Sequence, residues 1–397
     1  MIGTKPLRIM FVINGLGTGG AQRSLLELLP RLTQAELRPS VVVLRSTHEG
    51  VESEVREHGY PILVLGGQTV IGRIARLRRM IAMQRPDIVH TAIFDSDVVG
   101  RIAAMRTSTT VLTSLVNTPY DPVRAKDPNV RSTHLRALKQ IDGWTARHLT
   151  AHFHAISHAV KASAVKDLGI RPHRVTVIER GRDTIRLGEP GPERRARSRH
   201  ALGIDEADRV LVNVGRQEFQ KGQRDLLEAV ALLANRPNLV LLIAGRRGHA
   251  SQDLDRAIHD LRLEDRVRFL GHREDVPELL AAADLFVFPS LYEGLGGALI
   301  EAMALAVPVV TSRIDAIEEV VEGGRGAALV APGRPAELAA AIADLLDDPV
   351  RARALGDRGR SIFLERFTLD RSADRMVQLY RSLAIAGARN RRTATTT

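Results

Sequence analysis

Cysteine is absent from this chain of 397 residues. Its absence excludes a disulfide framework, a zinc–thiolate site and a cysteine nucleophile, and it fits a reducing cytoplasm. Aromatic residues make up only 4% of the chain and form no stacking set of the kind that binds single strands, so we expect no nucleic-acid partner. No apolar run is long enough to cross a bilayer, because Glu301 and Pro308 interrupt the most apolar stretch, residues 298–310.

Positive charge is concentrated in the first half of the sequence. The chain has 57 Lys and Arg residues and 46 Asp and Glu residues, and residues 1–200 hold 31 and 17 of them. The first half therefore carries a net charge of +14, and residues 201–397, with 26 basic and 29 acidic residues, carry −3. A basic half favours a phosphorylated substrate or an anionic lipid surface as a partner. The alternative is an Arg-rich surface that only contacts solvent.

Short β-rich runs alternate with longer helical stretches along the chain. We expect strands at residues 7–13, 40–44, 61–65, 87–91 and 110–116, and again at residues 209–215, 239–245, 266–271, 285–290 and 307–312. This alternation predicts an α/β fold with two doubly wound, Rossmann-like parallel sheets. Ligands of such sheets bind at the carboxyl ends of the strands.

The length and the restart of the strand series predict two domains. We place an N-terminal domain at residues 1–186, a linker rich in Gly, Pro and Arg at 187–204, a C-terminal domain at 205–365, a C-terminal helix at 366–386 and a disordered polar tail at 387–397. The apolar run near the N-terminus is too short for a secretory signal and predicts a buried first strand.

A glycine-rich turn, GLGTGG at residues 15–20, connects the first strand to a helix and matches the dinucleotide pattern G-x-G-x-x-G. Glycines at such a turn let the backbone approach an anion at a helix N-terminus. Arg45 stands where an NAD enzyme has an acid, which suits NADP. An NADP-dependent oxidoreductase is therefore one alternative function, and a tight turn without a ligand is the structural alternative.

The second half carries two groups of charged residues at strand ends. NVGRQEFQKG, residues 213–222, brings Arg216 and Lys221 beside a helix N-terminus, where two cations suit a diphosphate. Glu293 follows a later strand, and Glu301 lies eight residues further on an apolar helix. A buried acid needs a partner, and vicinal hydroxyls of a sugar or a ribose supply one. The structural alternatives are surface cations and an acid held in a salt bridge.

These motifs resemble those of the retaining glycosyltransferases of family four, which have the two-domain GT-B fold. EGLGGALIEAMALAVPVVTS and VGRQEFQKG carry the resemblance, and FLGHREDVPELLAAADLFVFPS, GTGGAQRSLLELL and HAISHAVKASAVKDLGIRPHRVTVIERGRD extend it from about residue 8 to residue 320. The resemblance implies two Rossmann-like domains facing across a cleft, with the C-terminal helix returning to the first domain. It also implies transfer of a sugar from a nucleotide-diphosphate sugar to an acceptor with retention of anomeric configuration, in cell-envelope, polysaccharide or glycolipid biosynthesis.

The resemblance assigns a role to each matching residue. Glu293 would bond hydroxyls of the donor sugar, and Glu301 would bond the ribose. Arg216 and Lys221 would hold the diphosphate and neutralise the leaving group, so that neither a metal nor a cofactor is implied. The other donor-binding positions are backbone and loop residues: Gly19, Gly20, Gly271, His272, Gly294, Leu295, Gly296 and Gly297.

The sequence departs from the family pattern at two places. Asn117 stands where many members keep a His; because it cannot shuttle a proton, we expect it to hydrogen-bond the sugar or the acceptor. RGRD at residues 180–183 replaces the usual Asn-Gly-x-Asp. His90 and His154 are expected to be structural histidines, with a contact to the acceptor as the alternative.

A helix predicted over residues 71–81 has Ile71, Ile74, Leu77 and Ile81 roughly on one side and three arginines off that stripe. The pattern predicts either a sheet-covering helix or a helix that rests on an anionic membrane. The second interpretation suits a lipid-linked acceptor and a cytoplasmic protein at the inner face of the membrane. Besides the oxidoreductase, the alternatives are a sugar-nucleotide epimerase of the same fold and a non-catalytic nucleotide-sugar binder.

Overall fold

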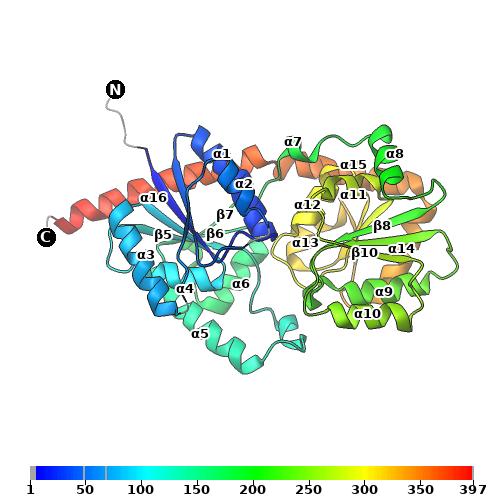
Figure 1. Cartoon of the computed structure of the whole chain (residues 1–397), viewed down its shortest axis with the longest axis horizontal. Helices are drawn as coiled ribbons and strands as arrows, with labels where there is room; N and C mark the ends of the chain where they lie inside the picture. Colours follow the sequence, from blue (N-terminus) through cyan, green and yellow to red (C-terminus); the bar gives the residue numbers. More distant parts are fainter. Residues whose placement is uncertain (1–5, 48–49, 68, 396–397) are drawn as a thin grey trace. The chain divides into compact units, whose positions relative to one another are not determined.

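The computed structural model describes residues 6–47, 50–67 and 69–395, and the chain divides into two compact units. Unit 1 comprises residues 1–120, 132–181 and 369–397, and unit 2 comprises residues 121–131 and 182–368. Each unit contains one parallel sheet with helices on its faces (Figure 1). The two doubly wound sheets that the alternating pattern predicts are confirmed.

The sheet of unit 1 has seven strands in the order β3-β2-β1-β4-β5-β6-β7, and all neighbouring strands pair in parallel. The strands are β1 (Arg8–Ile13), β2 (Arg38–Val43), β3 (Ile62–Val64), β4 (Ile88–Ala92), β5 (Thr110–Leu115), β6 (His152–Ala155) and β7 (Val175–Val177). The carboxyl ends of β1, β4, β5 and β6 therefore meet at one edge of the sheet, which is where residues for ligand binding are expected.

Helices cover both faces of this sheet. Successive side chains of a strand point to opposite faces, so each face carries apolar side chains that the helices bury. The helices of unit 1 are α1 (Gly20–Gln34), α2 (Glu52–Glu57), α3 (Val70–Gln84), α4 (Phe94–Ala103), α5 (Ser132–Leu149), α6 (His158–Leu168) and α16 (Leu369–Thr395). Phe11 of β1 packs in one apolar cluster with residues of α1 and α16, whereas Met10 and Val12 pack in another with residues of α3 and α4.

The C-terminal helix α16 belongs to unit 1, which confirms its predicted return to the first domain. Its Tyr380 is completely buried in the cluster that contains Phe11. The helix continues through Thr395, so the tail expected to be disordered from residue 387 is helical over most of its length. Alanine and arginine have high helix propensity, and this propensity outweighs the polar composition from which disorder was predicted. Residues 396–397 lie outside the described residues.

The sheet of unit 2 has six parallel strands in the order β10-β9-β8-β11-β12-β13. They are β8 (Arg209–Val214), β9 (Leu239–Ala244), β10 (Val267–Gly271), β11 (Leu285–Phe288), β12 (Val309–Ser312) and β13 (Ala328–Val330). The helices are α7 (Thr184–Leu187), α8 (Pro192–Ala201), α9 (Gln223–Leu232), α10 (Ser251–Asp260), α11 (Val276–Ala282), α12 (Gly297–Ala304), α13 (Asp315–Val320), α14 (Pro335–Asp347) and α15 (Pro349–Arg366). Short 3-10 helices include η1 (Pro122–Lys126) and η3 (Phe219–Lys221), both in unit 2.

The segment expected to be a linker, residues 187–204, is part of unit 2 and contains α8. Two of its arginines are held by ion pairs with one acid: Arg195 and Arg199 lie 2.8 and 3.3 Å from the carboxylate of Asp284. The Gly, Pro and Arg content resembles that of a linker, but charge pairing with a distant acid holds the segment on the domain.

Candidate functional site

Two loops of unit 2 are joined at the carboxyl edge of its sheet. The backbone N–H of Leu291, after β11, donates to the carbonyl of Gln220, after β8, at 2.8 Å, and the Gln220 amide donates to the Tyr292 carbonyl at 2.8 Å. Gly222 has φ +59°, and a Cβ at this position would lie 2.1 Å from the carbonyl oxygen of Pro289. Only glycine allows this approach, so Gly222 permits the two loops to present their side chains together.

The side chains that this junction brings together are Lys221 and Glu293. The Lys221 ammonium contacts Glu293 Oε1 and also lies 5.3 Å from the ring centroid of Phe288, and the Ser290 hydroxyl donates to the same carboxylate oxygen at 3.2 Å. Both charged side chains are largely shielded from solvent, with 18% and 10% exposed. The predicted cation and the predicted acid thus form one charged pair at the strand ends.

Arg216 does not join this pair in the structure. Its side chain is 60% exposed, and Nη1 lies 3.7 Å from Glu218 Oε1. It follows β8 on the same loop as Lys221, so it remains at the same edge of the sheet but faces solvent. An exposed pair of this kind is weak, and it leaves the guanidinium able to reorient toward an anion.

Glu301 lies on α12, and its carboxylate is held by two arginines. Arg182 Nε and Arg186 Nη2 both donate to Glu301 Oε1, at 2.8 and 3.0 Å. The salt bridge that the sequence left as a structural alternative is therefore present. The helix begins after Gly296, whose φ of +82° is compatible with glycine and costly for other residues. Sequence reasoning named neither arginine; the signal was the unusual RGRD at residues 180–183.

The other donor-binding positions predicted in unit 2 occupy two loops. Gly271 ends β10 with φ +66°, its carbonyl accepts from the Gly245 N–H at 2.7 Å, and the following His272 is exposed. In the loop that follows Glu293, Gly294, Leu295 and Gly296 are buried, and Gly297, the first residue of α12, is half-buried.

The predicted positions of unit 1 lie after β1 and after β5. Gly19 precedes α1, where its carbonyl accepts from two backbone N–H groups of the first turn, and Gly20 is the exposed first residue of the helix. Asn117 is half-buried, and its side-chain oxygen accepts from the N–H of Thr118 at 2.8 Å. This bond fixes the amide at the end of β5, with its NH₂ group as the donor that remains for a ligand.

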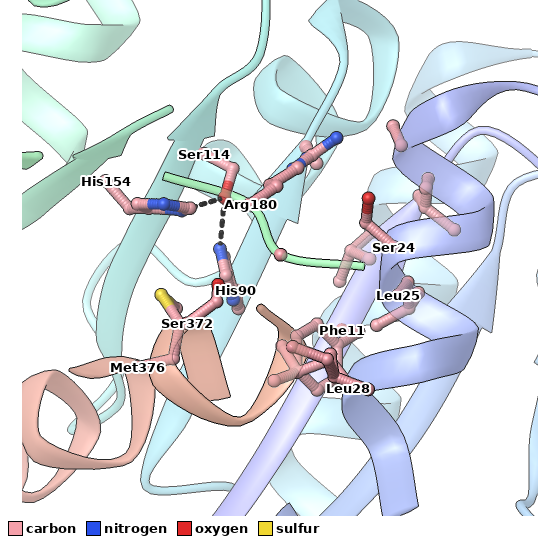
Figure 2. Close-up of a pocket in the computed structure, with 16 residues that line it drawn as sticks. Phe11, Ser24, Leu25, Leu28, His90, Ser114, His154, Arg180, Ser372 and Met376 are labelled. Carbon is pink, nitrogen blue, oxygen red and sulfur yellow. Dashed lines mark hydrogen bonds between the residues drawn. The ribbon is translucent and has the colours of Figure 1, made fainter. Parts of the chain in front are cut away.

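His90 and His154 belong to a buried hydrogen-bond chain in unit 1 (Figure 2). His154 Nε2 lies 2.8 Å from the Ile178 carbonyl, which can only accept, so Nδ1 accepts from the Ser114 hydroxyl at 2.8 Å. His90 Nε2 then donates to Ser114 at 2.7 Å, and Nδ1 accepts from the Tyr380 hydroxyl at 2.8 Å. Both rings are neutral, because burial lowers the pKa of His154 to about 4 and that of His90 well below its ordinary value.

A cavity lies beside this chain, on the face of the sheet covered by α1 and α16. Its lining includes the apolar side chains of Phe11, Leu25, Leu28 and Met376 and the polar side chains of Ser24, Ser114 and Arg180; Figure 2 shows Ser24 beside Leu25, and Arg180 near Ser114. The strand residues that line this cavity come from the carboxyl halves of β1, β4, β5 and β6, so the cavity lies at the ligand-binding edge of unit 1.

A buried charge cluster lies between α4 and α5. Arg101 Nη1 donates to Asp142 Oδ1 at 2.7 Å and to the Thr145 hydroxyl at 3.0 Å, and the Tyr120 hydroxyl donates to Asp142 Oδ2 at 2.9 Å. Asp97 is a second buried acid beside this arginine, and its Oδ1 has no hydrogen-bond partner among the described residues. Burial raises the pKa of Asp97 to about 7, against the attraction of Arg101 and with the repulsion of Asp142.

Neither a metal cluster nor a membrane-spanning helix is found within the described ranges. No group of three or more His, Asp or Glu residues there is arranged to hold a metal ion. No helix in the same part of the chain is both long enough and apolar enough to cross a bilayer.

Two family models match the two halves of the chain. Residues 194–362 match the model described as Glycosyl transferases group 1, and residues 18–186 match Glycosyltransferase Family 4. The alpha-maltose-1-phosphate synthase of Mycolicibacterium smegmatis is 31% identical over 318 residues, 75% of this chain and 79% of the relative. The chain belongs to the group 1 glycosyltransferases of family 4. The resemblance found in the sequence is thereby confirmed.

Further similarities agree with this assignment. The lipopolysaccharide core biosynthesis mannosyltransferase LpsB of Rhizobium meliloti is 34% identical over 216 residues, 52% of this chain and 61% of the relative. The crystal structure of Anabaena HepE in complex with UDP-glucose superposes with a TM-score of 0.84 at 24% identity, covering 95% of this chain and all of that one. This likeness shows that the glycosyltransferase has the GT-B fold, as predicted.

The family assignment also decides between the functions that the sequence left open. Residues 18–20 of the glycine-rich turn and all of α1 lie within the segment that matches Family 4, so this part of the dinucleotide-like pattern belongs to the glycosyltransferase match. This glycosyltransferase is an enzyme of glycan biosynthesis, and neither the oxidoreductase nor the epimerase is favoured.

Proposed function

We propose that this glycosyltransferase moves a sugar from a nucleotide-diphosphate sugar to an acceptor with retention of anomeric configuration, in cell-envelope, polysaccharide or glycolipid biosynthesis. The observation that carries the proposal is the Lys221–Glu293 pair at the carboxyl edge of the unit 2 sheet. HepE, which shares the fold, binds UDP-glucose, and LpsB acts in lipopolysaccharide core biosynthesis; both support the donor class and the biosynthetic role.

The donor would be bound mainly by unit 2. A carboxylate that already contacts a lysine can still accept from sugar hydroxyls through its second oxygen, which is the role proposed for Glu293. Lys221 and the reorienting Arg216 would neutralise the diphosphate. Glu301 would accept from the ribose, and the loop of Gly271 and His272 would lie along the base.

The chemistry would rest on electrostatics and positioning. In a retaining transfer the acceptor attacks from the face that the leaving group departs, and the leaving diphosphate takes the acceptor proton. No carboxylate nucleophile below the sugar ring is needed, in contrast to a retaining glycosidase. Cations fixed beside the diphosphate stabilise the charge that develops as the bond to the sugar breaks. The proposal assigns this neutralisation to protein cations and requires neither a metal nor a cofactor.

Nucleotide binding is expected to raise the melting temperature. A ligand present at about 100 times its Kd stabilises the native state by about 2.7 kcal/mol, a rise of roughly 5–10 °C for a domain of this size. A thermal-shift series with UDP, GDP, ADP and their glucose or mannose conjugates measures it, with inorganic sulfate as the control for unspecific anion binding. A panel in which no nucleotide raises the midpoint and no conjugate is hydrolysed would contradict the proposal.

Retention is expected to be visible in donor hydrolysis. When water replaces the acceptor, an α-linked donor should first release the α-anomer of the sugar, because attack comes from the face that the leaving group departs. Proton NMR of the anomeric signal during the first minutes measures this before mutarotation. Initial release of the β-anomer would show inversion instead.

The acceptor would be held by unit 1, whose sequence carries the positive charge. Helix α3 contains four arginines and no acid. Leu77 and Ile81 are buried against the sheet, so the helix does cover it, but Val70 and Ile71 in its first turn are 53% and 80% exposed. An exposed apolar tip on an arginine-rich helix favours peripheral contact with an anionic membrane and a lipid-linked acceptor.

Salt-sensitive binding to anionic vesicles is the expected consequence. Vesicles of phosphatidylglycerol should pellet the protein at low salt, and both high salt and the double change Val70→Ser with Ile71→Ser should release it. Met83→Ser is the matched control, because Met83 is 68% exposed near the other end of α3. Equal pelleting with phosphatidylcholine vesicles, or none at low salt, would refute membrane contact.

A further inference from the structure

The segment RGRD places Arg182 at a fixed, buried position in unit 2. The backbone N–H of Arg182 donates to the carbonyl of Phe367 at 2.8 Å, and Arg182 pairs with Thr368 as an isolated parallel bridge. Phe367 is completely buried, and Arg182 is 3% exposed. A backbone anchored in this way gives the long arginine side chain a defined origin, so its guanidinium has little freedom.

Arg186 is placed one turn later by a helix cap. The Asp183 carboxylate accepts from the N–H of Ile185 at 2.9 Å and starts the four-residue helix α7, which carries Arg186. Asp183, the last residue of RGRD, is therefore the helix cap, and it lies between the two arginines that contact Glu301.

Both guanidiniums of this arginine pair, Arg182 and Arg186, converge on Glu301 Oε1. The two distances are 2.8 and 3.0 Å, and the Glu301 side chain is 11% exposed. Both of these hydrogen bonds are made to Oε1, and none to Oε2 is found among the described residues. One carboxylate oxygen is thus saturated by charge-assisted hydrogen bonds, while the other retains its capacity to accept.

The arginine pair also determines the space at the start of α12. A Cβ on Gly297 would lie 2.2 Å from Arg182 Nη2, so the guanidinium packs directly on this glycine. The carboxylate therefore cannot turn Oε1 toward a ligand without breaking two ionic hydrogen bonds, which are costly to lose in a buried position.

We propose that Arg182 and Arg186 are specificity-determining positioning residues, which hold Glu301 by Oε1 so that Oε2 alone is presented to the ribose hydroxyls of the donor nucleotide. This inference rests on the proposed function, because it assumes a nucleotide at this site. The recognition of ribose then depends on the fixed orientation of the Glu301 carboxylate and not only on the presence of this acid. A protein with the same acid and a rotating carboxylate would distinguish ribose from its deoxy form less well.

The test compares nucleotides that differ only in their ribose hydroxyls. UDP, GDP and ADP and their 2′,3′-dideoxy counterparts are titrated by calorimetry into the wild-type protein and into Arg182→Gln, Arg186→Gln and Glu301→Gln. For whichever diphosphate binds, the measured quantity is the ratio of the affinity for the ribose nucleotide to the affinity for its dideoxy counterpart. In the wild type this ratio should be at least about 10-fold, because a site that hydrogen-bonds the hydroxyls binds a nucleotide without them poorly. In all three variants this ratio should fall below about 3-fold.

This affinity ratio distinguishes a loss of positioning from a loss of charge or of folded protein, because the latter two weaken the binding of both nucleotides of a pair equally. Arg236→Gln is the matched control, because Arg236 pairs with Asp347 and precedes β9 at the amino edge of the sheet; it should keep the wild-type ratio. Arg186→Lys keeps a donor for Oε1 and should restore part of the ratio. If Arg182→Gln does not fold, Arg186→Gln decides, because its side chain is 29% exposed.

The outcomes also separate this inference from the function on which it rests. Nucleotide binding with a wild-type ratio in a folded Arg186→Gln protein would overturn the role of the arginine pair and leave the donor class intact. A wild-type protein that binds none of the three diphosphates would overturn the proposed function itself.

Discussion

Replacing Lys221 by alanine is expected to lower kcat/KM for donor hydrolysis by about 10²–10³-fold, the usual cost of removing one fixed group that stabilises transition-state charge. The ammonium is the buried cation at the joined loops and lies against the Phe288 ring, in a position shielded from water where charge interactions are strong. The measurement is the initial rate of nucleotide release at substrate concentrations well below KM.

Arg224→Ala provides the control for Lys221→Ala. Arg224 is a cation of the neighbouring helix α9, 44% exposed and paired with Glu228, so its loss should change the rate by less than 2-fold, as expected for an exposed pair. The double change Lys221→Ala with Glu293→Gln tests whether the two groups act as a unit. If they do, it should cost little more than Lys221→Ala alone. A Lys221→Ala protein of near wild-type rate would remove the lysine from the mechanism.

The sequence predicted most of the sheet architecture because the long strands are continuous apolar runs. All ten expected strands are present, each within a few residues of its expected bounds. The three strands that were not expected are short: β6 has four residues, two of them His, and β7 and β13 have three residues each. These short strands are defined by pairing with their neighbours, which local periodicity does not record; β7 and β13 are also edge strands.

The candidate site was predictable where its chemistry lies in local motifs. Lys221 and Glu293 each follow a strand, and the carboxyl ends of parallel strands meet at one edge. Their direct contact depends on the backbone approach at Gly222, which no local pattern indicates. The partners of Glu301 were missed for a similar reason: Arg182 lies 119 residues earlier and meets it only in the folded unit.

Asp97 shows a different limit of sequence reasoning. In the sequence it forms an Asp-x-Asp pattern with Asp95, which is typical of metal binding, yet the two side chains have different surroundings. Asp95 is exposed and accepts from the Asn14 amide at 3.2 Å, whereas Asp97 is buried beside the Arg101–Asp142 pair. Arg101 neutralises one acid, so the second buried carboxyl retains its proton to higher pH. Burial, not the spacing of the pattern, determines its chemistry.

The protonation of Asp97 is expected to make the stability of unit 1 depend on pH. With a pKa of about 7 in the fold and 3.8 in the unfolded chain, Asp97 favours folding fully below pH 3.8, and this contribution is lost as the pH rises to about 7. His154 acts in the opposite direction: its folded pKa of about 4 lies below its unfolded value of 6.5, so its contribution is present above pH 6.5 and lost as the pH falls to about 4. Asp97 and His154 oppose each other between pH 4 and 6.5. The pKa of His90 is also lowered by burial, so His90 adds to the effect of His154, and the stability of the wild type should rise with pH over this range.

Asp97→Asn should separate these effects. At pH 8 it removes a buried charge and should stabilise unit 1 by up to about 4 kcal/mol, the linkage equivalent of the pKa shift, whereas near pH 4 it should have almost no effect. Urea unfolding followed by the fluorescence of Trp144, the single tryptophan of the chain and a residue of α5, reports on unit 1. Asp95→Asn, on the exposed side of the same helical turn, should show no such pH dependence. A stability difference between Asp97→Asn and wild type that is constant from pH 4 to 8 would mean that Asp97 is ionised throughout, and that Arg101 compensates two buried carboxylates rather than one.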